Sequence, residues 1–400
     1  MALLHHFKNH VRPYKCGPDF IDPQFHQKIT NTASINLDGY ICNETQLTWM
    51  FSNYADKEIA VIEGVMGYYD GMDKGASAYD VAKTLNIPTI LVLDGSGSYI
   101  TIAAVLKGLC SFRDDHTIKA IVLNKLSSKM HYELIKKHIE AELPDITVLG
   151  WIKKELPLLA STHLGLDLNE IESSKLDTLA DEVLEHIDIK KLLSLTTYTP
   201  PPKPPYPFPS FFKEDKKCVL IQDENFSFVY ADNIAYLKER YKSLKIIQAT
   251  KDEAIPDDAD IVILPGGYVE TDIAYSRIKD AKKFEASLKE HIKKEKKVYA
   301  ECAGLVYLGK RCDEKEMLGA LDITFTLSQK RERLGYYNSV EEETIHKGHA
   351  FHYTKVLDAP PTNILLYKTT PKTAKAGGWK KDNIYATYLH TFWRLYPELF

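Results

Sequence analysis

The chain has 400 residues, a length that suits two domains better than a single core. Hydrophobic residues make up 44% and charged residues 26%, and a net charge of −4 excludes a basic field that would attract nucleic acid or an anionic membrane. No apolar run could span a bilayer, the first ten residues do not resemble a signal peptide, and the six cysteines lack metal-site or disulfide spacing, so we expect a reduced cytoplasmic protein.

The first predicted elements are a helix at residues 1–7 and a strand that ends at Lys15 in a polar loop. A lysine at the carboxyl end of a strand can face a phosphate, and two aspartates three residues apart, Asp19 and Asp22, can hold Mg²⁺ or orient a substrate group. A turn with solvated acids is the alternative that these residues leave open.

Short apolar runs then alternate with helical patterns, which predicts a parallel sheet with helices on its faces. The strands are Ile59–Ile62, Thr89–Leu93 and Ile118–Leu123, and the helices are Asp80–Leu85, Ser98–Leu109, His131–Leu143 and Lys175–Leu195. Glu63 ends the first of these strands, as the Mg²⁺-binding acid does in P-loop enzymes. Asn124 ends the third, where such folds often contact the nucleotide base.

Seven of the eleven residues 199–209 are proline, which excludes a helix or a central strand there. We therefore expect a first domain at 1–195, an extended linker at 196–215 and a second domain at 216–400. The second domain repeats the alternation, with strands at Cys218–Ile221, Ile261–Leu264 and Lys297–Glu301 and helices at Tyr230–Tyr241 and Ile278–Glu295.

Cys302 lies where a strand stops and a helical pattern starts, with the small residues Ala300, Ala303 and Gly304 around it. Small neighbours permit a tight strand-to-helix turn that presents the sulfur at a helix start, where we expect a lowered thiol pKa. A buried structural cysteine is the alternative interpretation.

Two further segments support a nucleophilic role for this cysteine. Gly266 and Gly267 follow a strand and, with Ala303, could direct backbone N–H groups at an oxyanion. His390 follows the strand Ile384–Tyr388 and could act as the base. A glycine loop, then a cysteine, then a distant histidine is the order found in class I glutamine amidotransferases.

Several motifs resemble the cobyrinic acid a,c-diamide synthase family. In the second half they are residues 223–230, Pro265–Tyr268, Ala300–Leu308 and Gly348–Tyr353, and in the first half they are Lys15–Pro23, Glu63–Gly67 and His163–Leu166. The resemblance covers essentially the whole chain. It implies an α/β protein of two domains: a dethiobiotin-synthetase-like P-loop NTPase fold with a parallel sheet, then a class I glutamine amidotransferase domain of flavodoxin-like architecture.

The resemblance also implies the chemistry. Cys302 would attack the glutamine carboxamide and His390 would serve as acid and base. Members of this branch lack the carboxylate that usually orients the histidine from two residues further on, and Phe392 stands there. The family usually has Glu at Ala350, often Arg at Tyr337, and Gly at Ala303.

In the first half, the resemblance gives Lys15 a role at a phosphate and Glu63 a role at Mg²⁺. Asp19 and Asp22 would position a corrinoid carboxylate and the transferred phosphoryl group, and Asn124 would meet the nucleotide. The partners implied are ATP, Mg²⁺, glutamine and a cobyrinate-type tetrapyrrole, with no nucleic acid or membrane, in a monomer or homodimer.

The sequence contains no G-x-x-x-x-G-K-[ST], the loop that cradles ATP phosphates in this family. We expect it to precede Met1 in the native gene product together with one strand, so that the sheet lacks a central strand. Three alternatives remain: amidation of hydrogenobyrinate or nickel sirohydrochlorin, an ATP-inactive tetrapyrrole-binding protein, and a partition-type nucleotide switch, which Cys302 and His390 argue against.

Overall fold

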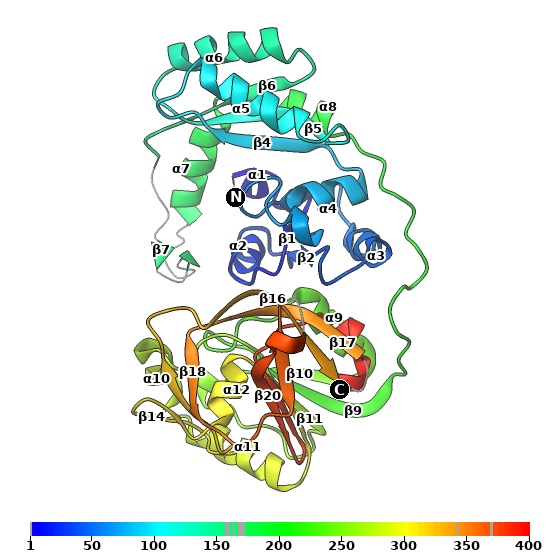
Figure 1. Ribbon diagram of the computed structural model, residues 1–400, viewed down its shortest axis with the longest axis vertical. Coiled ribbons are helices and arrows are strands. Elements are labelled where there is room, and N and C mark those ends of the chain that lie inside the picture. Colours follow the sequence, from blue (N-terminus) through cyan, green and yellow to red (C-terminus); the bar gives the residue numbers. More distant parts are fainter. Residues whose placement is uncertain (1, 157–160, 163–164, 167–172, 342–343, 369–370) are drawn as a thin grey trace. The chain divides into compact units, whose positions relative to one another are not determined.

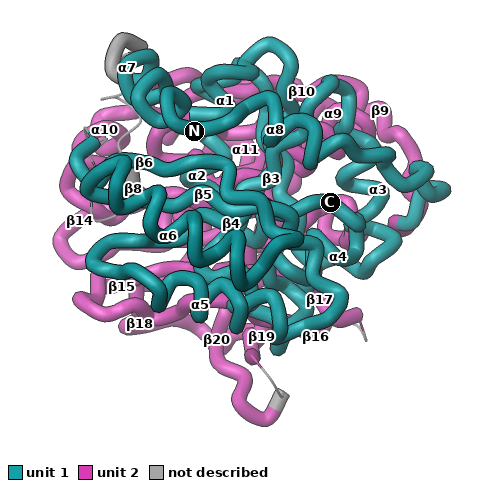
Figure 2. The backbone as a smooth tube through the Cα atoms, turned by 90° about the horizontal axis from the view of Figure 1, so that it is seen from above, with its two compact units in different colours: residues 1–207 teal, residues 208–400 magenta. Residues whose placement is uncertain are grey.

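A computed structural model describes residues 2–156, 161–162, 165–166, 173–341, 344–368 and 371–400. The chain divides into two compact units, residues 1–207 and 208–400 (Figure 2). The division falls within the proline-rich segment. No helix among the described residues is long and apolar enough to cross a membrane.

Unit 1 contains two parallel three-stranded sheets (Figure 1). The first has the order β2-β1-β3 and the second the order β4-β5-β6. The strands are β1 (Val11–Cys16), β2 (Ile35–Leu37), β3 (Ile59–Glu63), β4 (Thr89–Asp94), β5 (Ile118–Leu126) and β6 (Thr147–Lys153). The predicted strands of this half are therefore confirmed, but they form two sheets rather than one.

The interruption lies between β3 and β4, each of which pairs with one neighbour only in the part of the chain described. No residue of β3 is buried, and Val92 on β4 is 60% exposed. Strands of an uninterrupted parallel sheet are covered on both faces. In the described residues β3 and β4 are therefore partly exposed sheet edges.

Helices cover both faces of the second sheet. On one face α5 (Ile100–Ser111) and α6 (Lys129–Glu142) pack through Leu106 and Ile135 against Ile121 and Leu123 of β5. On the opposite face α8 (Ile189–Leu195) packs on alternate residues of the same strand. The remaining helices of this unit are α1 (Ala2–His6), α2 (Ile21–Thr30), α3 (Glu44–Tyr54), α4 (Ala78–Leu85) and α7 (Ser173–Leu184).

The prediction of one helix at Lys175–Leu195 is wrong, because α7 and α8 are separate helices. Between them the chain runs along β6: Trp151 N–H donates to His186 O, and Asp188 N–H donates to Leu149 O. The Asp188 side chain then accepts a hydrogen bond from Lys191 N–H and caps α8. Tertiary pairing with the sheet has overridden the helical pattern.

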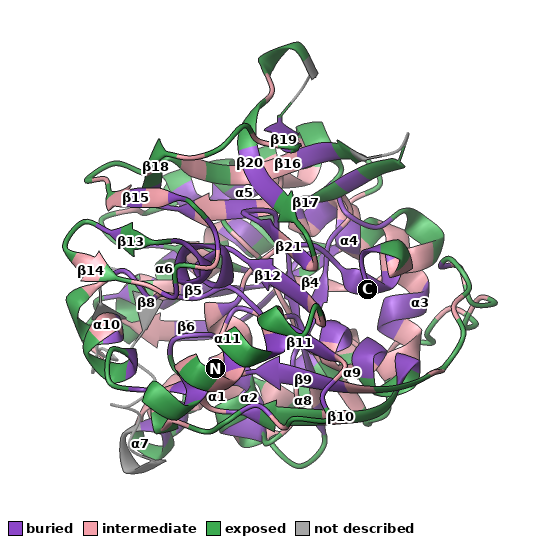
Figure 3. Ribbon diagram, turned by 90° about the horizontal axis from the view of Figure 1, so that it is seen from below, coloured by how far each residue is buried: buried purple, intermediate pink, exposed green. Residues whose placement is uncertain are grey.

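Unit 2 is built on a nine-stranded sheet with the order β10-β9-β11-β12-β21-β20-β19-β16-β17. The first five strands are parallel: β9 (Glu214–Ile221), β10 (Tyr241–Ile247), β11 (Ile261–Leu264), β12 (Lys297–Glu301) and β21 (Ile384–Thr387). The others are antiparallel: β16 (Arg333–Glu341), β17 (Thr344–His352), β19 (Ile364–Tyr367) and β20 (Lys375–Lys381). The predicted strands of this half are confirmed, and Figure 3 shows β11 and most of β12 as buried.

The helices of unit 2 are α9 (Ala231–Arg240), α10 (Asp272–Ile278), α11 (Lys282–Lys293) and α12 (Ala303–Leu308). The predicted helix at Ile278–Glu295 is thus shorter than expected, since Ile278 ends α10 and α11 begins at Lys282. A second sheet of four short strands has the order β14-β13-β15-β18, at Lys315–Glu316, Arg311–Cys312, Thr324–Leu327 and Thr354–Asp358.

Candidate active site

The candidate site of unit 2 forms where three adjacent parallel strands end. In the order β11-β12-β21, Leu264 pairs with Ala300 and Glu301 pairs with Thr387. The glycine loop, Cys302 and the segment bearing His390 therefore leave the sheet at one edge. Carboxyl ends of parallel strands are where such sheets place ligand sites. Residues more than 120 positions apart in sequence become neighbours through this register.

Cys302 occupies a strained turn between β12 and α12. Its backbone has φ 45° and ψ −100°, a conformation that L-residues seldom adopt. Its N–H donates to Thr387 O at 2.8 Å, which ties the turn to β21. A strained strand-to-helix elbow of this kind is typical of enzyme nucleophiles.

Cys302 is 5% exposed. Burial, together with the nearby Glu270 carboxylate, raises its pKa, whereas the backbone N–H groups of Gly267 and Ala303 act in the opposite direction. The expectation of a lowered thiol pKa is therefore wrong, because burial outweighs the turn. A base must remove the proton before the sulfur can attack.

The predicted oxyanion residues divide into two groups. The backbone N–H groups of Gly267 and Ala303 point towards the sulfur of Cys302. Gly266 makes room for the histidine: a Cβ there would lie 2.1 Å from Cε1 of His390. Glycine at this position lets the imidazole pack directly on the backbone of the loop.

His390 is 1% exposed and is held by its backbone and its ring. Its N–H and C=O pair with those of His349, each hydrogen bond being 2.8 Å long. Its Nδ1 lies 3.2 Å from Oε2 of Glu301, the residue that precedes the cysteine. Sequence reasoning missed Glu301. An acid at the end of a buried strand next to the nucleophile was the available signal.

Two other histidines lie near His390, in the segment Gly348–Tyr353. Burial lowers the pKa of His349 and of His352 to about 3, so both are neutral near pH 7. His352 Nδ1 interacts with Thr354 O, and its ring stacks on Tyr388. Neither His349 nor His352 makes the carboxylate contact that His390 makes with Glu301.

In unit 1, three predicted carboxylates converge around the ammonium group of Lys15. Lys15 Nζ donates to Asp22 Oδ2 at 2.5 Å and lies 3.7 Å from Asp19 Oδ2 and 3.9 Å from Glu63 Oε2. Burial opposes the charged form of Lys15, but the three carboxylates together raise its pKa. Lys15 is therefore a permanent cation that lies among carboxylate oxygens at the carboxyl ends of β1 and β3.

Glu63 has a second partner that the sequence did not indicate. His26 Nε2 lies 2.5 Å from Glu63 Oε2, and its Nδ1 lies 3.0 Å from Ser34 Oγ. Burial alone would raise the pKa of Glu63, but the hydrogen bond from His26 and the charge of Lys15 lower it to about 2. Glu63 is thus ionised near pH 7, as a Mg²⁺ ligand must be.

The structure separates Asn124 from this group. It lies on β5, in the other sheet of unit 1, where its side chain accepts a hydrogen bond from Lys125 N–H.

The described residues contain no cluster of three or more histidine, cysteine or acidic side chains with metal-site geometry. Mg²⁺ commonly uses one or two carboxylates together with substrate phosphates, and Glu63, Asp19 and Asp22 supply suitable oxygens.

Family models match both units. A CobB/CobQ-like glutamine amidotransferase domain matches residues 217–395, and an AAA domain matches residues 21–162. A cobyrinate a,c-diamide synthase of Caldanaerobacter subterraneus is 32% identical over 98% of this chain and 90% of its own length. Those of Listeria monocytogenes and Fusobacterium nucleatum are 32% and 34% identical, over 98% of this chain and 92% and 93% of their lengths.

The chain belongs to the cobyrinate a,c-diamide synthase family. Its predicted fold, an α/β chain with a P-loop-type first half and a glutamine amidotransferase second half, is confirmed. Of the family motifs noted in the sequence, His163 and the residue after it lie outside the described residues. Ala350, which replaces the usual Glu, is fully buried on β17.

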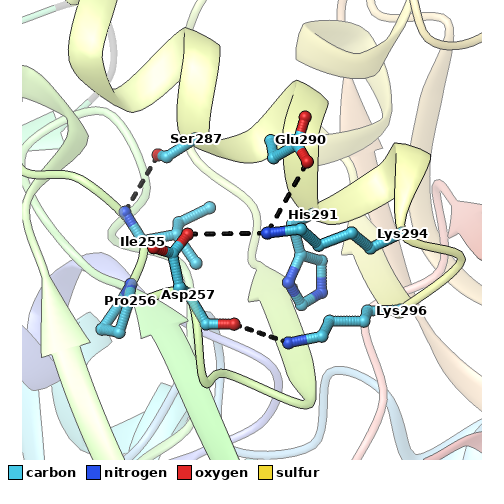
Figure 4. Close-up of a pocket in the computed structure, with 8 residues that line it drawn as sticks. All are labelled: Ile255, Pro256, Asp257, Ser287, Glu290, His291, Lys294 and Lys296. Carbon is cyan, nitrogen blue, oxygen red and sulfur yellow. Dashed lines mark hydrogen bonds and ion pairs between the residues drawn. The ribbon is translucent and has the colours of Figure 1, made fainter.

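A small hollow in unit 2 does not belong to this family site. It has room for about one water molecule, about 10 Å³ (Figure 4). Lys294 lies 3.7 Å from Asp257 and 3.6 Å from Glu290, and Lys296 donates to Asp257 O, so the charged groups at its rim pair with one another. Nothing about it indicates a ligand.

Proposed function

We propose that this chain catalyses the ATP- and glutamine-dependent amidation of the a and c carboxylates of cobyrinate in cobalamin biosynthesis. The observation that carries the proposal is the placement of Cys302 and His390 at adjacent strand ends, beside the glycine loop, in a chain of this family. The relatives named above are cobyrinate a,c-diamide synthases, and this chain matches them over nearly their whole length.

In the glutaminase step, His390 takes the thiol proton of Cys302, and Sγ attacks the carboxamide carbon of glutamine. The N–H groups of Gly267 and Ala303 stabilise the oxyanion that forms. His390 returns the proton to the leaving nitrogen, ammonia departs, and a glutamyl thioester remains. Water, deprotonated by His390, then releases glutamate and restores the thiol.

In the synthetase step, a cobyrinate carboxylate attacks the γ-phosphorus of ATP, which gives an acyl phosphate and ADP. Ammonia then attacks the acyl carbon and phosphate leaves. Phosphorylation comes first because oxide is a very poor leaving group. We assign Lys15 to the phosphates, Asp19 and Asp22 to the substrate carboxylate, and Asn124 to the nucleotide.

Glu63 is the proposed Mg²⁺ ligand. A bound Mg²⁺ supplies charge neutralisation at the phosphates. Glu63 is ionised and adjacent to Lys15, which supports this assignment. We also propose a cytoplasmic enzyme, because all six cysteines are free thiols. We propose that it is monomeric or homodimeric.

The test uses glutamine labelled with ¹⁵N in the amide. Incubation of the native gene product with cobyrinate, ATP and Mg²⁺ should give a product with two ¹⁵N atoms, and Cys302→Ser should abolish incorporation from glutamine. If glutamine were hydrolysed but cobyrinate recovered unchanged, the synthetase assignment would fall and the glutaminase would stand. Hydrolysis by Cys302→Ser at the parental rate would refute the nucleophile.

A further inference from the structure

We infer that Glu301 is the positioning residue that holds His390 in its catalytic tautomer. The inference rests on the proposed glutaminase and extends it. Class I enzymes usually place the orienting acid two residues after the histidine, where this chain has Phe392. Here the acid comes from the residue before the nucleophile, on the neighbouring strand β12.

The Glu301 carboxylate is 2% exposed, and both its oxygens are used. Oε1 accepts hydrogen bonds from Trp393 Nε1 at 2.7 Å and from Tyr299 Oη at 2.8 Å. Oε2 lies 3.2 Å from Nδ1 of His390. Two donors thus fix the carboxylate, and the second oxygen is presented to the imidazole.

This arrangement decides where the imidazole proton resides. A carboxylate only accepts hydrogen bonds, so Nδ1 of His390 carries hydrogen. Nε2 is then the unprotonated nitrogen that can take the proton of Cys302. Once His390 is protonated, the buried negative charge of Glu301 stabilises the imidazolium, as the acid of a Ser-His-Asp triad does.

Glu301→Gln tests the inference with almost no change in shape. Trp393 Nε1 can only donate, so the amide oxygen of Gln must face it, and the amide NH₂ must face Nδ1 of His390. The ring then carries its proton on Nε2 and cannot accept one from Cys302. We expect kcat for glutamine hydrolysis to fall about 10³- to 10⁴-fold with KM unchanged, the loss known for a wrong-tautomer triad.

Glu301→Asp keeps the charge but shortens the reach, so we expect an intermediate loss of kcat. Asp232→Asn is the matched control, since Asp232 is also a buried acid of unit 2 but pairs with Arg394. It should lower the melting temperature and leave kcat per folded molecule within about twofold of the parent. Inactivation by the glutamine analogue 6-diazo-5-oxo-L-norleucine should slow with kcat in each variant.

The outcomes separate the inference from the proposed function. If Glu301→Gln keeps kcat within threefold of the parent while Cys302→Ser is inactive, the positioning role is wrong and the glutaminase stands. If Glu301→Gln loses activity only in proportion to its unfolded fraction, Glu301 is structural and the inference is overturned. Full activity of Cys302→Ser would overturn the glutaminase itself.

Discussion

Replacing Gly266 by alanine tests how tightly the glycine loop fixes the catalytic base. The new Cβ would lie 2.1 Å from Cε1 and 3.1 Å from both ring nitrogens of His390. Ordinary contact begins near 3.4 Å, so the ring or the loop must move by about 1.3 Å, the difference between 3.4 and 2.1. His390 cannot retreat easily, because its backbone is bonded on both sides to His349 and its ring to Glu301.

A displacement of about 1 Å in a catalytic group costs about 10²-fold in rate, and forced overpacking costs about 1–3 kcal/mol of stability. We therefore expect Gly266→Ala to lower kcat/KM for glutamine hydrolysis about 10²-fold, measured as glutamate release, and to lower the melting temperature. Gly108→Ala is the matched control: nothing lies within 4 Å of its added Cβ, and it sits in helix α5. A parental kcat/KM in Gly266→Ala would refute the reasoning.

Three further predictions concern other groups. Cys302→Ser should retain the parental melting temperature within about 2 °C but lose at least 10³-fold in glutamine hydrolysis, as glutamate release will show. The pKa of Glu63 is lowered to about 2 by His26 and Lys15 against the effect of burial, so its contribution to stability is present above about pH 4.5 and is lost as the pH falls towards 2. Across that range the free energy of unfolding in urea should vary less with pH for Glu63→Gln than for the parent, and an unchanged pH profile would contradict this. The same variant should slow Mg²⁺-dependent amidation. Asp232→Ala should lower the free energy of unfolding by about 3 kcal/mol in urea, because it leaves the buried Arg394 guanidinium with less compensation, and a loss under 1 kcal/mol would contradict this.

Local patterns were sufficient for most elements of the fold. The strands Ile261–Leu264 and Lys297–Glu301 have the bounds that their apolar runs predict, because buried parallel strands are short and continuous in hydrophobicity. The break between α7 and α8 was not predictable in the same way. It depends on hydrogen bonds from residues 186–188 to β6, which lies more than thirty residues earlier in the chain.

The candidate site was predictable only where local sequence patterns define it. Cys302 and His390 each follow a recognisable strand, Lys15 and Glu63 lie at the carboxyl ends of two strands of one sheet, and Asp19 lies in the loop after the first of these strands. Roles that depend on pairing across the sheet were not visible. Contact between Glu301 and His390 requires β12 and β21 to be neighbours in register, and the contact of His26 with Glu63 requires α2 to pack beside β3.

The same limit applies to the chemistry of Cys302. A helix start after the cysteine suggested a lowered thiol pKa, but the extent of burial around the sulfur follows from the assembled sheet and helices. In the folded chain that burial dominates, and the pKa is raised. Activation therefore depends on His390, which increases the importance of whatever holds that ring in place.

Covalent capture of the nucleophile tests the central claim most directly. The 400-residue chain would be treated with 6-diazo-5-oxo-L-norleucine, and peptides would be analysed by mass spectrometry. We predict one adduct per chain, on the peptide that contains Cys302, with protection by glutamine and no adduct in Cys302→Ser. An unlabelled protein, or a label on another cysteine such as Cys312, would contradict the account.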